Sequence, residues 1–424
     1  MEWFQGILLF ITYAGLIYYS VKGGNLVIGF LIMALLWSVI GGIPYMTTIN
    51  TVIEKGAESY GVTAMVVIFG SWFGRVIVDT GIAGSIIRKT VELGGDKPLV
   101  VTMLLSLVTS LIFTSAFGVG AVIAIGVVIL PILLSLGVPK RVAASSFTLS
   151  VGAGMFINVV LFKQVQLFFP SVKFDSHWLS FGFAAMIVQL VLIFVMLAVN
   201  LRPSKLQRAW AAPLQQQTTT DEVPMLAFIV PIVPVLMAIV FGWQPVPAIL
   251  LAIILAFVLT KKLAHPKEAA ALVQKTLYDG VADVGLLLGM LFMLAMFGKA
   301  AGLDAHIFQP LLGPVIPHSA LVLALILGLL APLALFRGPL MIWGAGSATV
   351  AVLSGLHIFS PALLLPMVYI PTISMAISAD ATQSWNLWAL TYTKLTIKEF
   401  LKTGVFWAWV IVIVNELIAV QMFS

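Results

Sequence analysis

Long apolar runs follow one another along most of the chain, separated by short charged or Pro/Gly-rich connections. A helix that spans a bilayer needs roughly 20 mostly apolar residues. Two stretches, 99–168 and 321–390, are too long and too rich in Gly and Ser to be single helices. The remaining runs are predicted as membrane helices near 4–19, 26–45, 62–82, 178–199, 225–240, 248–259, 284–297 and 406–420.

The placement of basic residues predicts how the first irregular stretch is folded. Loops rich in Lys and Arg stay in the cytoplasm, so Lys97 and Lys140 are expected on the same side of the membrane. Both reach that side if the chain between them enters the membrane and returns, as a helical hairpin with its tip near 114–120. The same reasoning predicts a second hairpin that re-enters from the outer side, with its tip near 337–346.

Each half of the chain then has three spans, a hairpin, an interrupted span and a final span, in opposite orientations. This order is typical of the inverted repeats of secondary transporters. The polar segment 202–223 is predicted to be a cytoplasmic linker between the halves, because it carries Arg202, Lys205 and Arg208. The predicted domains are a first repeat, 1–201, with an inward-opening hairpin at 99–137 and an interrupted span at 142–168, and a second repeat, 224–424, with an outward-opening hairpin at 319–353 and an interrupted span at 361–390.

Composition excludes a soluble protein. Hydrophobic residues make up 61% of the 424 residues and charged residues only 9%, whereas soluble domains have about a quarter charged. The net charge of +6 is spread over the connections, so no nucleic-acid partner is expected. Cysteine is absent, which excludes disulfides and thiolate chemistry. We expect a multi-pass protein of the cytoplasmic (inner) membrane, with the lipid bilayer as its solvent.

Small and hydroxyl residues gather at four predicted backbone breaks, namely the two hairpin tips and two segments inside the interrupted spans, 150–154 and 378–382. Non-helical backbone at membrane depth survives only where protein or a water-filled cavity surrounds it. Half-helix ends at such breaks can bind an anionic substrate; alternatively, Gly and Ser there only permit close helix packing. The candidate substrate-binding residues are Thr114, Ser115, Gly118, Gly152, Asn158, Arg337, Gly338, Gly346, Ser347 and Thr349.

Ionisable residues narrow the chemistry further, because a charge at bilayer depth is costly and usually functional. Arg337 at the second tip suits bidentate capture of a carboxylate, or it extends from the outer interface into water. Ser378, Asp380 and Thr382 are predicted to hold the coupling ion, a proton or Na⁺; alternatively, Asp380 caps the following half-helix. Arg75 and Asp79 are predicted to form an interfacial ion pair. The histidines lack metal-ligand spacing, so neither a metal nor a cofactor is expected.

Two short motifs resemble those of gluconate permease-like carriers. Residues 69–74 together with 79–81 are similar to the signature of that family's third span, and the run Gly-Ser-Ala-Thr-Val-Ala at 346–351 resembles its second hairpin. From about 26 to 420 the chain is similar in arrangement to the ion transporter superfamily, which includes gluconate, citrate and dicarboxylate carriers. The resemblance implies an elevator-type fold, usually homodimeric, H⁺ or Na⁺ symport of an organic anion, and substrate contacts at Ser115, Gly118, Arg337 and Ser347.

Three classes of function are weighed. A channel needs a continuous polar path, which the pattern does not show. A membrane enzyme needs a nucleophile, a metal site or paired acids, so the protein is not expected to be an enzyme. The expected function is cation-coupled symport of a small organic anion, such as a sugar acid or hydroxycarboxylate. H⁺ is favoured over Na⁺ because both tips lack the Ser-Asn-Thr motifs of dicarboxylate carriers. The alternatives are an anion channel or uniporter, and a Na⁺-coupled di- or tricarboxylate carrier.

Overall fold

The computed structural model describes residues 2–201, 223–312 and 314–424, and these form helices and connections without any strand. By length and composition, five helices in the described ranges can cross a membrane, or up to seven if each of two bent pairs is one span. The predicted all-α membrane fold is therefore confirmed. The five are α1 (Glu2–Val21), the continuous helix Tyr45–Asp79, α10 (Ser176–Asn200), α13 (Pro266–Leu312) and α18 (Ile397–Phe423).

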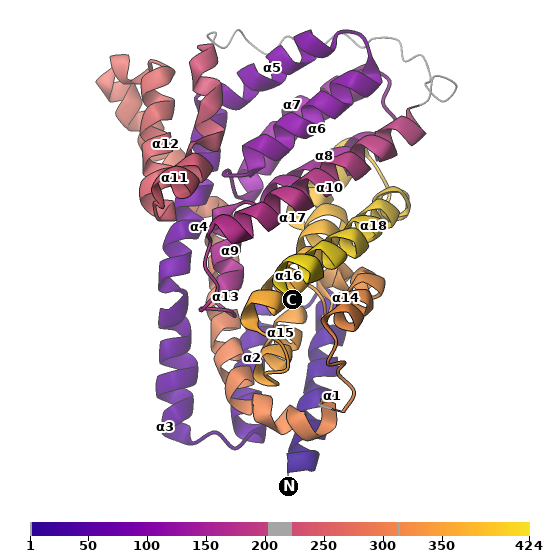
Figure 1. Cartoon of the computed structure of the whole chain (residues 1–424). Helices are drawn as coiled ribbons and strands as arrows, with labels where there is room; N and C mark the ends of the chain where they lie inside the picture. Colours follow the sequence, from indigo (N-terminus) through magenta and orange to yellow (C-terminus); the bar gives the residue numbers. More distant parts are fainter. Residues whose placement is uncertain (1, 202–222, 313) are drawn as a thin grey trace.

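Two long helices pack against each other along their length and form the central framework of the molecule (Figure 1). One consists of α3 (Tyr45–Thr47), the π-helical turn η1 (Thr48–Glu54) and α4 (Lys55–Asp79). The other, α13, has 47 residues, which at a rise of 1.5 Å per residue is about 70 Å and more than twice the thickness of a bilayer core. The predicted span 284–297 is thus only part of a longer helix, and the predicted span 62–82 begins inside α4 and runs past its end at Asp79. Both long helices continue through charged residues that end the apolar runs.

Reciprocal glycine contacts hold α4 against α13. A Cβ on Gly56 would lie 2.8 Å from the Met296 Cα, and a Cβ on Gly280 would lie 2.7 Å from the Trp72 Cα. Such glycines let two helix backbones approach closely. Gly280 follows Gly56, and Met296 follows Trp72, by the same 224 positions. Equivalent residues of the two chain halves therefore make equivalent contacts.

Short helices flank the long pair at its opposite ends (Figure 1). At one end α1 and α2 (Leu26–Ile40) pack against α13. At the other end η3 (Met225–Ile232), α11 (Val233–Phe241) and α12 (Pro245–Leu259) form a group whose α12 packs against α4. We call α1 to α4 together with η3 to α13 the scaffold. Helix α5 (Ile82–Gly94) then leads to the remaining helices, which we call the module.

The first half of the module contains a hairpin and a bent span. Helices α6 (Pro98–Phe113) and α7 (Val119–Ser135) run in opposite directions and are joined by the tip at 114–118. Helices α8 (Lys140–Met155) and α9 (Val159–Gln166) meet at an angle of 67°. The break in this span was predicted at 150–154, and that position is wrong, since α8 remains helical through Met155. Gly152 and Gly154 serve close packing inside α8, and the bend falls at 156–158.

The second half of the module repeats this order. Helix α14 (Ala320–Leu329) bends by 53° into the 3₁₀ turn η5 (Ala331–Arg337), and α15 (Gly346–Gly355) completes the hairpin. The following span comprises α16 (Pro361–Ile370), the π-helical η6 (Pro371–Ile377) and, after a break, α17 (Ser384–Thr393). This break lies at the predicted 378–382 region. The structure thus has two hairpins and two interrupted spans, as the sequence predicted.

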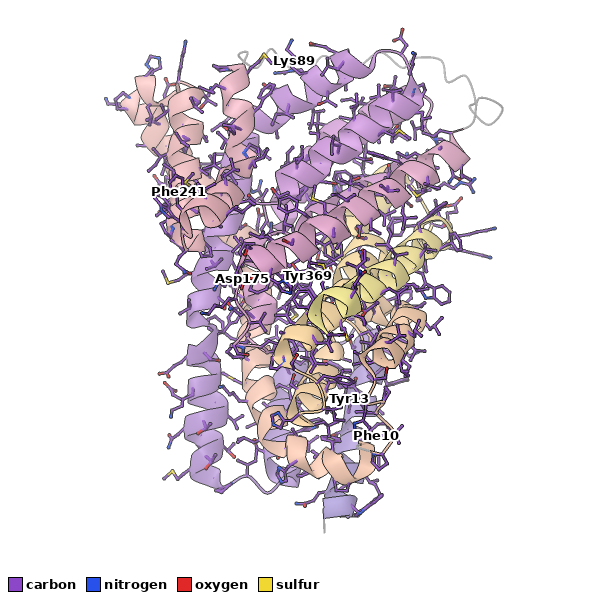
Figure 2. The ribbon with its side chains drawn as sticks, viewed as in Figure 1. Phe10, Tyr13, Lys89, Asp175, Phe241 and Tyr369 are labelled. Atoms are coloured by element: carbon purple, nitrogen blue, oxygen red, sulfur yellow. The ribbon has the colours of Figure 1, made fainter. Side chains whose placement is uncertain are left out.

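An aromatic cluster binds the two halves of the module together. Trp178 of α10 contacts the rings of Phe162, Phe181 and Tyr369, with ring centroids 4.7 to 5.4 Å apart. Tyr369 lies near the middle of the molecule (Figure 2), and its hydroxyl donates a hydrogen bond of 2.7 Å to the Met155 carbonyl. That carbonyl lies at the end of α8 and also accepts a hydrogen bond of 3.3 Å from the Asn158 backbone N–H. The cluster therefore fixes α16 beside the first bend.

Candidate functional site

The two interrupted spans cross at the centre of the module, where Gly152 of α8 faces Ser378 after η6. A Cβ on Gly152 would overlap the Ser378 Oγ, so only glycine lets the two segments come this close. Gln189 of α10 joins them. Its Nε2 donates to the Leu149 carbonyl at 2.7 Å and to Ser378 Oγ at 3.3 Å, while its Oε1 accepts from Ser374 Oγ at 2.9 Å.

Sequence analysis missed Gln189. The available signal was an amide in the middle of the apolar run 178–199, a position where a polar side chain must find partners inside the protein. Gln189 is fully buried and satisfies groups on both interrupted spans. It is a positioning residue that bridges the two spans.

Asn158 connects the first bend to the tip of the first hairpin. Its Nδ2 donates to the carbonyls of Phe113 and Ala116 at 2.9 and 3.0 Å, and its Oδ1 accepts from the Leu161 backbone N–H at 3.1 Å. One side chain thus caps the start of α9 and supplies donors to carbonyls left free at the end of α6. Asn158 therefore lies beside the predicted substrate-binding tip and holds it in place.

The tip of the first hairpin rests on α4 of the scaffold. The Thr114 hydroxyl donates to the Leu111 carbonyl at 2.8 Å, whereas the buried Ser115 hydroxyl has no hydrogen-bond partner among the described residues. Gly118 has a φ of 104°, which favours glycine. A Cβ there would lie 2.6 Å from Ser71 Oγ, a second buried hydroxyl without a partner. Two free hydroxyl donors therefore lie close to the start of α7.

The tip of the second hairpin is folded onto itself and onto the scaffold. The Gly346 N–H donates to the Gly338 carbonyl at 3.2 Å, and Ser347 Oγ donates to a tip carbonyl at 3.0 Å. Thr349 Oγ1 donates to another tip carbonyl at 2.7 Å and shares a hydrogen bond of 2.5 Å with the hydroxyl of Tyr13 on α1 (Figure 2). The four predicted residues of this tip therefore maintain its shape through these bonds.

Arg337 occupies a strained position at the end of η5. Its φ of 58° is uncommon for a residue with a side chain, and such residues concentrate at functional sites. The Ser20 hydroxyl of α1 donates a hydrogen bond of 3.1 Å to the Arg337 carbonyl. The half-buried guanidinium makes no hydrogen bond or ion pair with the described residues, but Asp380 attracts it electrostatically. Among the described residues, the Arg337 guanidinium thus remains a cation without an ion-pair partner at the second tip.

The three residues predicted to hold the coupling ion are only partly brought together. The Asp380 carboxylate accepts from the backbone N–H and the hydroxyl of Thr382, both at 2.8 Å. Ser378 instead donates to the Ile373 carbonyl at 2.9 Å and faces Gln189. Asp380 is fully buried and stabilises the turn that follows it. In the described ranges, no three His, Asp or Glu side chains cluster in a way that could hold a metal ion.

Arg75 and Asp79 do not pair with each other, contrary to the prediction. Arg75 makes a bidentate ion pair with Asp283 of α13, with both N–O distances at 2.6 Å, and Asp79 pairs with Lys275. The sequence could not show this, because the partner helix lies about 200 residues away. A Cβ on Gly120 of α7 would overlap both members of the Arg75–Asp283 pair, so the first hairpin lies directly on it.

No protein-family model and no curated protein sequence matches the chain. Among solved structures, the fold is similar to that of the Alcanivorax borkumensis YdaH transporter, whose topology is described as unusual. The TM-score is 0.62 at 14% sequence identity, and the match covers 94% of this chain and 98% of that one. The chain therefore has, over nearly its whole length, the fold of a membrane transporter. The resemblance to gluconate permease-like carriers stays a prediction.

Proposed function

We propose that the protein is a secondary active transporter of the cytoplasmic membrane, which moves a small organic anion together with a cation. The observation that carries this proposal is the packing of two hairpins and two interrupted spans in one module beside a separate scaffold. Transporter sites are typically built from such discontinuous helices. The fold shared with a known transporter supports the same assignment.

Arg337 supports an anionic substrate. A guanidinium that is half-buried and unpaired is costly unless an anion neutralises it, and its planar donors match a carboxylate. We infer that the anion is a sugar acid or a hydroxycarboxylate and that Asp380, one step away in the broken span, carries the coupling proton. H⁺ is favoured over Na⁺ because Ser378 is directed away from Asp380 and leaves few oxygen ligands around one cation.

An elevator motion of the module against the scaffold follows from the same arrangement. We propose that the module carries the anion while α4 and α13 stay fixed, and that two copies associate through their scaffolds, as the resemblance implies. We also propose that the loops around Lys140 and Lys267 face the cytoplasm and residues 355–360 face outside. The proposed linker 202–223 lies almost entirely outside the described residues.

Transport is tested with purified protein in proteoliposomes. Small carboxylates are first screened for those that raise the melting temperature, since a ligand of the folded state stabilises it by mass action. Counterflow is then measured with the best carboxylate. A carrier accelerates uptake of labelled anion when unlabelled anion is inside, whereas an anion channel shows no such acceleration. Uptake that is independent of internal anion would exclude a carrier.

Arg337→Lys tests anion recognition. The substitution keeps the positive charge and loses the bidentate geometry, so the apparent affinity should fall by about tenfold or more. Arg141→Lys, on an exposed position at the start of α8, is the matched control and should transport like the parent. Affinity is measured from the concentration dependence of counterflow at equal protein levels. Parental affinity in Arg337→Lys would remove the role proposed for Arg337.

A further inference from the structure

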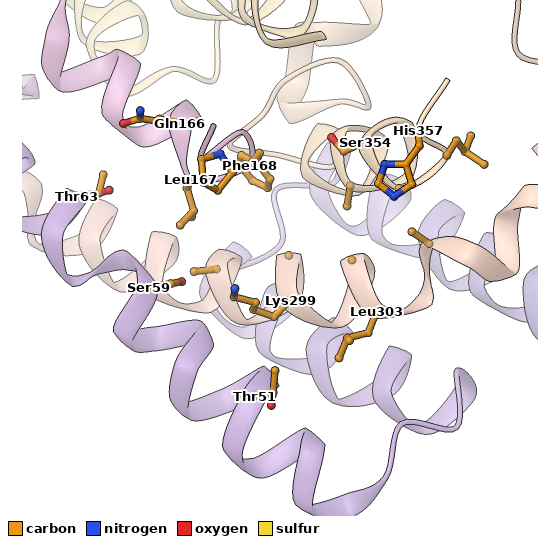
Figure 3. A pocket seen from close by; sticks show the side chains of 18 of the residues that line it. Thr51, Ser59, Thr63, Gln166, Leu167, Phe168, Lys299, Leu303, Ser354 and His357 are labelled. Atoms are coloured by element: carbon orange, nitrogen blue, oxygen red, sulfur yellow. The ribbon is translucent and has the colours of Figure 1, made fainter. Parts of the chain in front are cut away.

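A cavity of about 990 Å³ lies between scaffold and module, away from both hairpin tips (Figure 3). Residues of α4 and α13 line it on the scaffold side. Residues at the end of α9 and at the end of α15 line it on the module side. None of the residues predicted as substrate or ion ligands contributes to it. Its chemistry is therefore not explained by the site described above.

Two lysines, Lys163 and Lys299, contribute positive charge to the cavity. His306 and His357 line it as well. Among the described lining residues there is no carboxylate. The Lys299 ammonium is exposed and makes no hydrogen bond or ion pair within the described part of the chain, and Lys163 donates only to Gln166, at 2.8 Å. Two lysines without carboxylate partners give the cavity a positive potential.

The repeat allows the cavity to be compared with the equivalent scaffold surface at the first hairpin. On α4, the first hairpin covers Ser71, Gly74 and Arg75. Their equivalents 224 positions later on α13 are Ala295, Gly298 and Lys299, and all three line the cavity. The scaffold surface that is closed at one hairpin is therefore open at the other.

The same equivalence indicates which ligand is missing. Arg75 is neutralised by the carboxylate of Asp283, and the residue of α4 equivalent to Asp283 is Ser59, which also lines the cavity. Lys299 therefore has a hydroxyl where Arg75 has a carboxylate. Figure 3 shows Lys299 on α13 beside Ser59 on α4. A carboxylate from solution can occupy the place that the protein's own carboxylate occupies at the other end.

We propose that this cavity is an entrance site for a small carboxylate, which binds to Lys299 and Lys163. The Ser59 hydroxyl, which donates to the Gly56 carbonyl at 2.7 Å, becomes an additional donor when it rotates toward the carboxylate. That this carboxylate is also the transported substrate rests on the proposed function. Its binding in the cavity does not depend on that function. The Ser59 and Thr63 hydroxyls make the site suitable for a carboxylate that also carries hydroxyl groups. Anions recruited here are concentrated next to the second hairpin before it moves.

Charged thiol reagents measure the potential of the cavity without any transport assay. The chain has no cysteine, so Ser59→Cys supplies a single thiol at an exposed, nearly isosteric position. Its rates with an anionic and a cationic methanethiosulfonate are compared, each relative to a free thiol in solution. We expect the anionic reagent to be favoured, and Lys299→Gln to reduce that preference about threefold to tenfold at low salt. Lys267→Gln, at the far end of α13, is the matched control. A preference that is absent, or equal in both lysine variants, would overturn the proposal.

Protection then tests binding. An uncharged methanethiosulfonate reacts with Ser59→Cys in the presence of gluconate or of sorbitol, two open-chain compounds that differ in the carboxylate at C1. Slower reaction with gluconate, lost in Lys299→Gln, supports the site, and equal rates with both compounds overturn it. Transport by the same protein is measured separately. Protection without counterflow would contradict the proposed transport function and leave the anion site intact.

Discussion

Asp380 combines a structural and a chemical role in one carboxylate. Both oxygens accept hydrogen bonds from Thr382, which shapes the break before α17, and the same group attracts the Arg337 guanidinium across the gap to the second hairpin. Asn386 holds the backbone carbonyls of Ile377 and Asp380 at 3.0 and 2.9 Å. The carboxylate is therefore held in a fixed place by the turn that follows it.

Asp380→Asn tests whether this carboxylate carries the coupling proton. The amide keeps the shape and cannot exchange a proton, so exchange of bound anion should persist while uphill uptake driven by a pH gradient falls to background. Both activities are measured in proteoliposomes with the carboxylate found in the screen. Thr382→Val removes one hydrogen bond to Asp380 and is the control for altered turn geometry, and it should keep part of the uphill uptake. Accumulation by Asp380→Asn as steep as in the parent, under either a pH or a Na⁺ gradient, would contradict the coupling role.

At the scale of the elements, glycines determine how closely the interrupted spans pack. Gly152 faces Ser378 with no room for a methyl group, whereas Gly285 of α13 has open space where a Cβ would be. Both glycines lie inside helices. Replacing either glycine by alanine changes the helix propensity equally. The two positions differ in the space available for a methyl group.

Gly152→Ala and Gly285→Ala should therefore change stability in opposite directions. Alanine stabilises a helix interior by about 1 kcal/mol over glycine, so Gly285→Ala should raise the melting temperature. Gly152→Ala forces the two spans apart and should lower stability by about 1–3 kcal/mol, the usual cost of overpacking. Thermal melting in one detergent measures both. A higher melting temperature for Gly152→Ala would show that α8 and the segment after η6 do not pack as described.

Patterns along the chain predicted the type of each element better than its ends. The hairpin tips were predictable because Gly and Ser clusters interrupt apolar runs at places where basic residues require the chain to return. The bend before α9 was misplaced by a few residues, because Gly152 and Gly154 look like breakers although they serve packing. The Arg75–Asp283 pair and the bridge through Gln189 could not be predicted, since both depend on helices far apart in the sequence. The cavity at Lys299 was missed for the same reason.

At the scale of the whole molecule, the first hairpin and the scaffold are in direct contact. A Cβ on Gly74 of α4 would lie 2.7 Å from the Phe117 carbonyl oxygen and 2.8 Å from the Ala121 Cβ of α7. A disulfide needs a Cβ separation of about 3.5–4.5 Å, so cysteines at both positions can bond once the first tip moves away from α4 by about 1 Å. The absence of natural cysteines makes the pair specific.

Gly74→Cys with Ala121→Cys should lock the module against the scaffold. Oxidation is expected to abolish counterflow, and a reducing agent is expected to restore it, because the module must leave α4 during an elevator cycle. Each single cysteine variant is the control and should be insensitive to oxidant. Full counterflow by the oxidised double variant, with the cross-link verified by mass spectrometry, would exclude a motion that separates α7 from α4.

The equivalent contacts, which are 224 residues apart in the sequence, also predict a second conformation of the molecule. If each half of the chain is given the internal arrangement of the other half, the second hairpin covers Ala295, Gly298 and Lys299, and the first hairpin uncovers Arg75 and Asp283. The open cavity then lies at the other end of the scaffold, where Asp283 neutralises its positive charge. With these two conformations, an anion is attracted electrostatically at the end of the scaffold where it enters and is not attracted at the end where it leaves. The two ends of the scaffold would therefore favour binding at one face and release at the other.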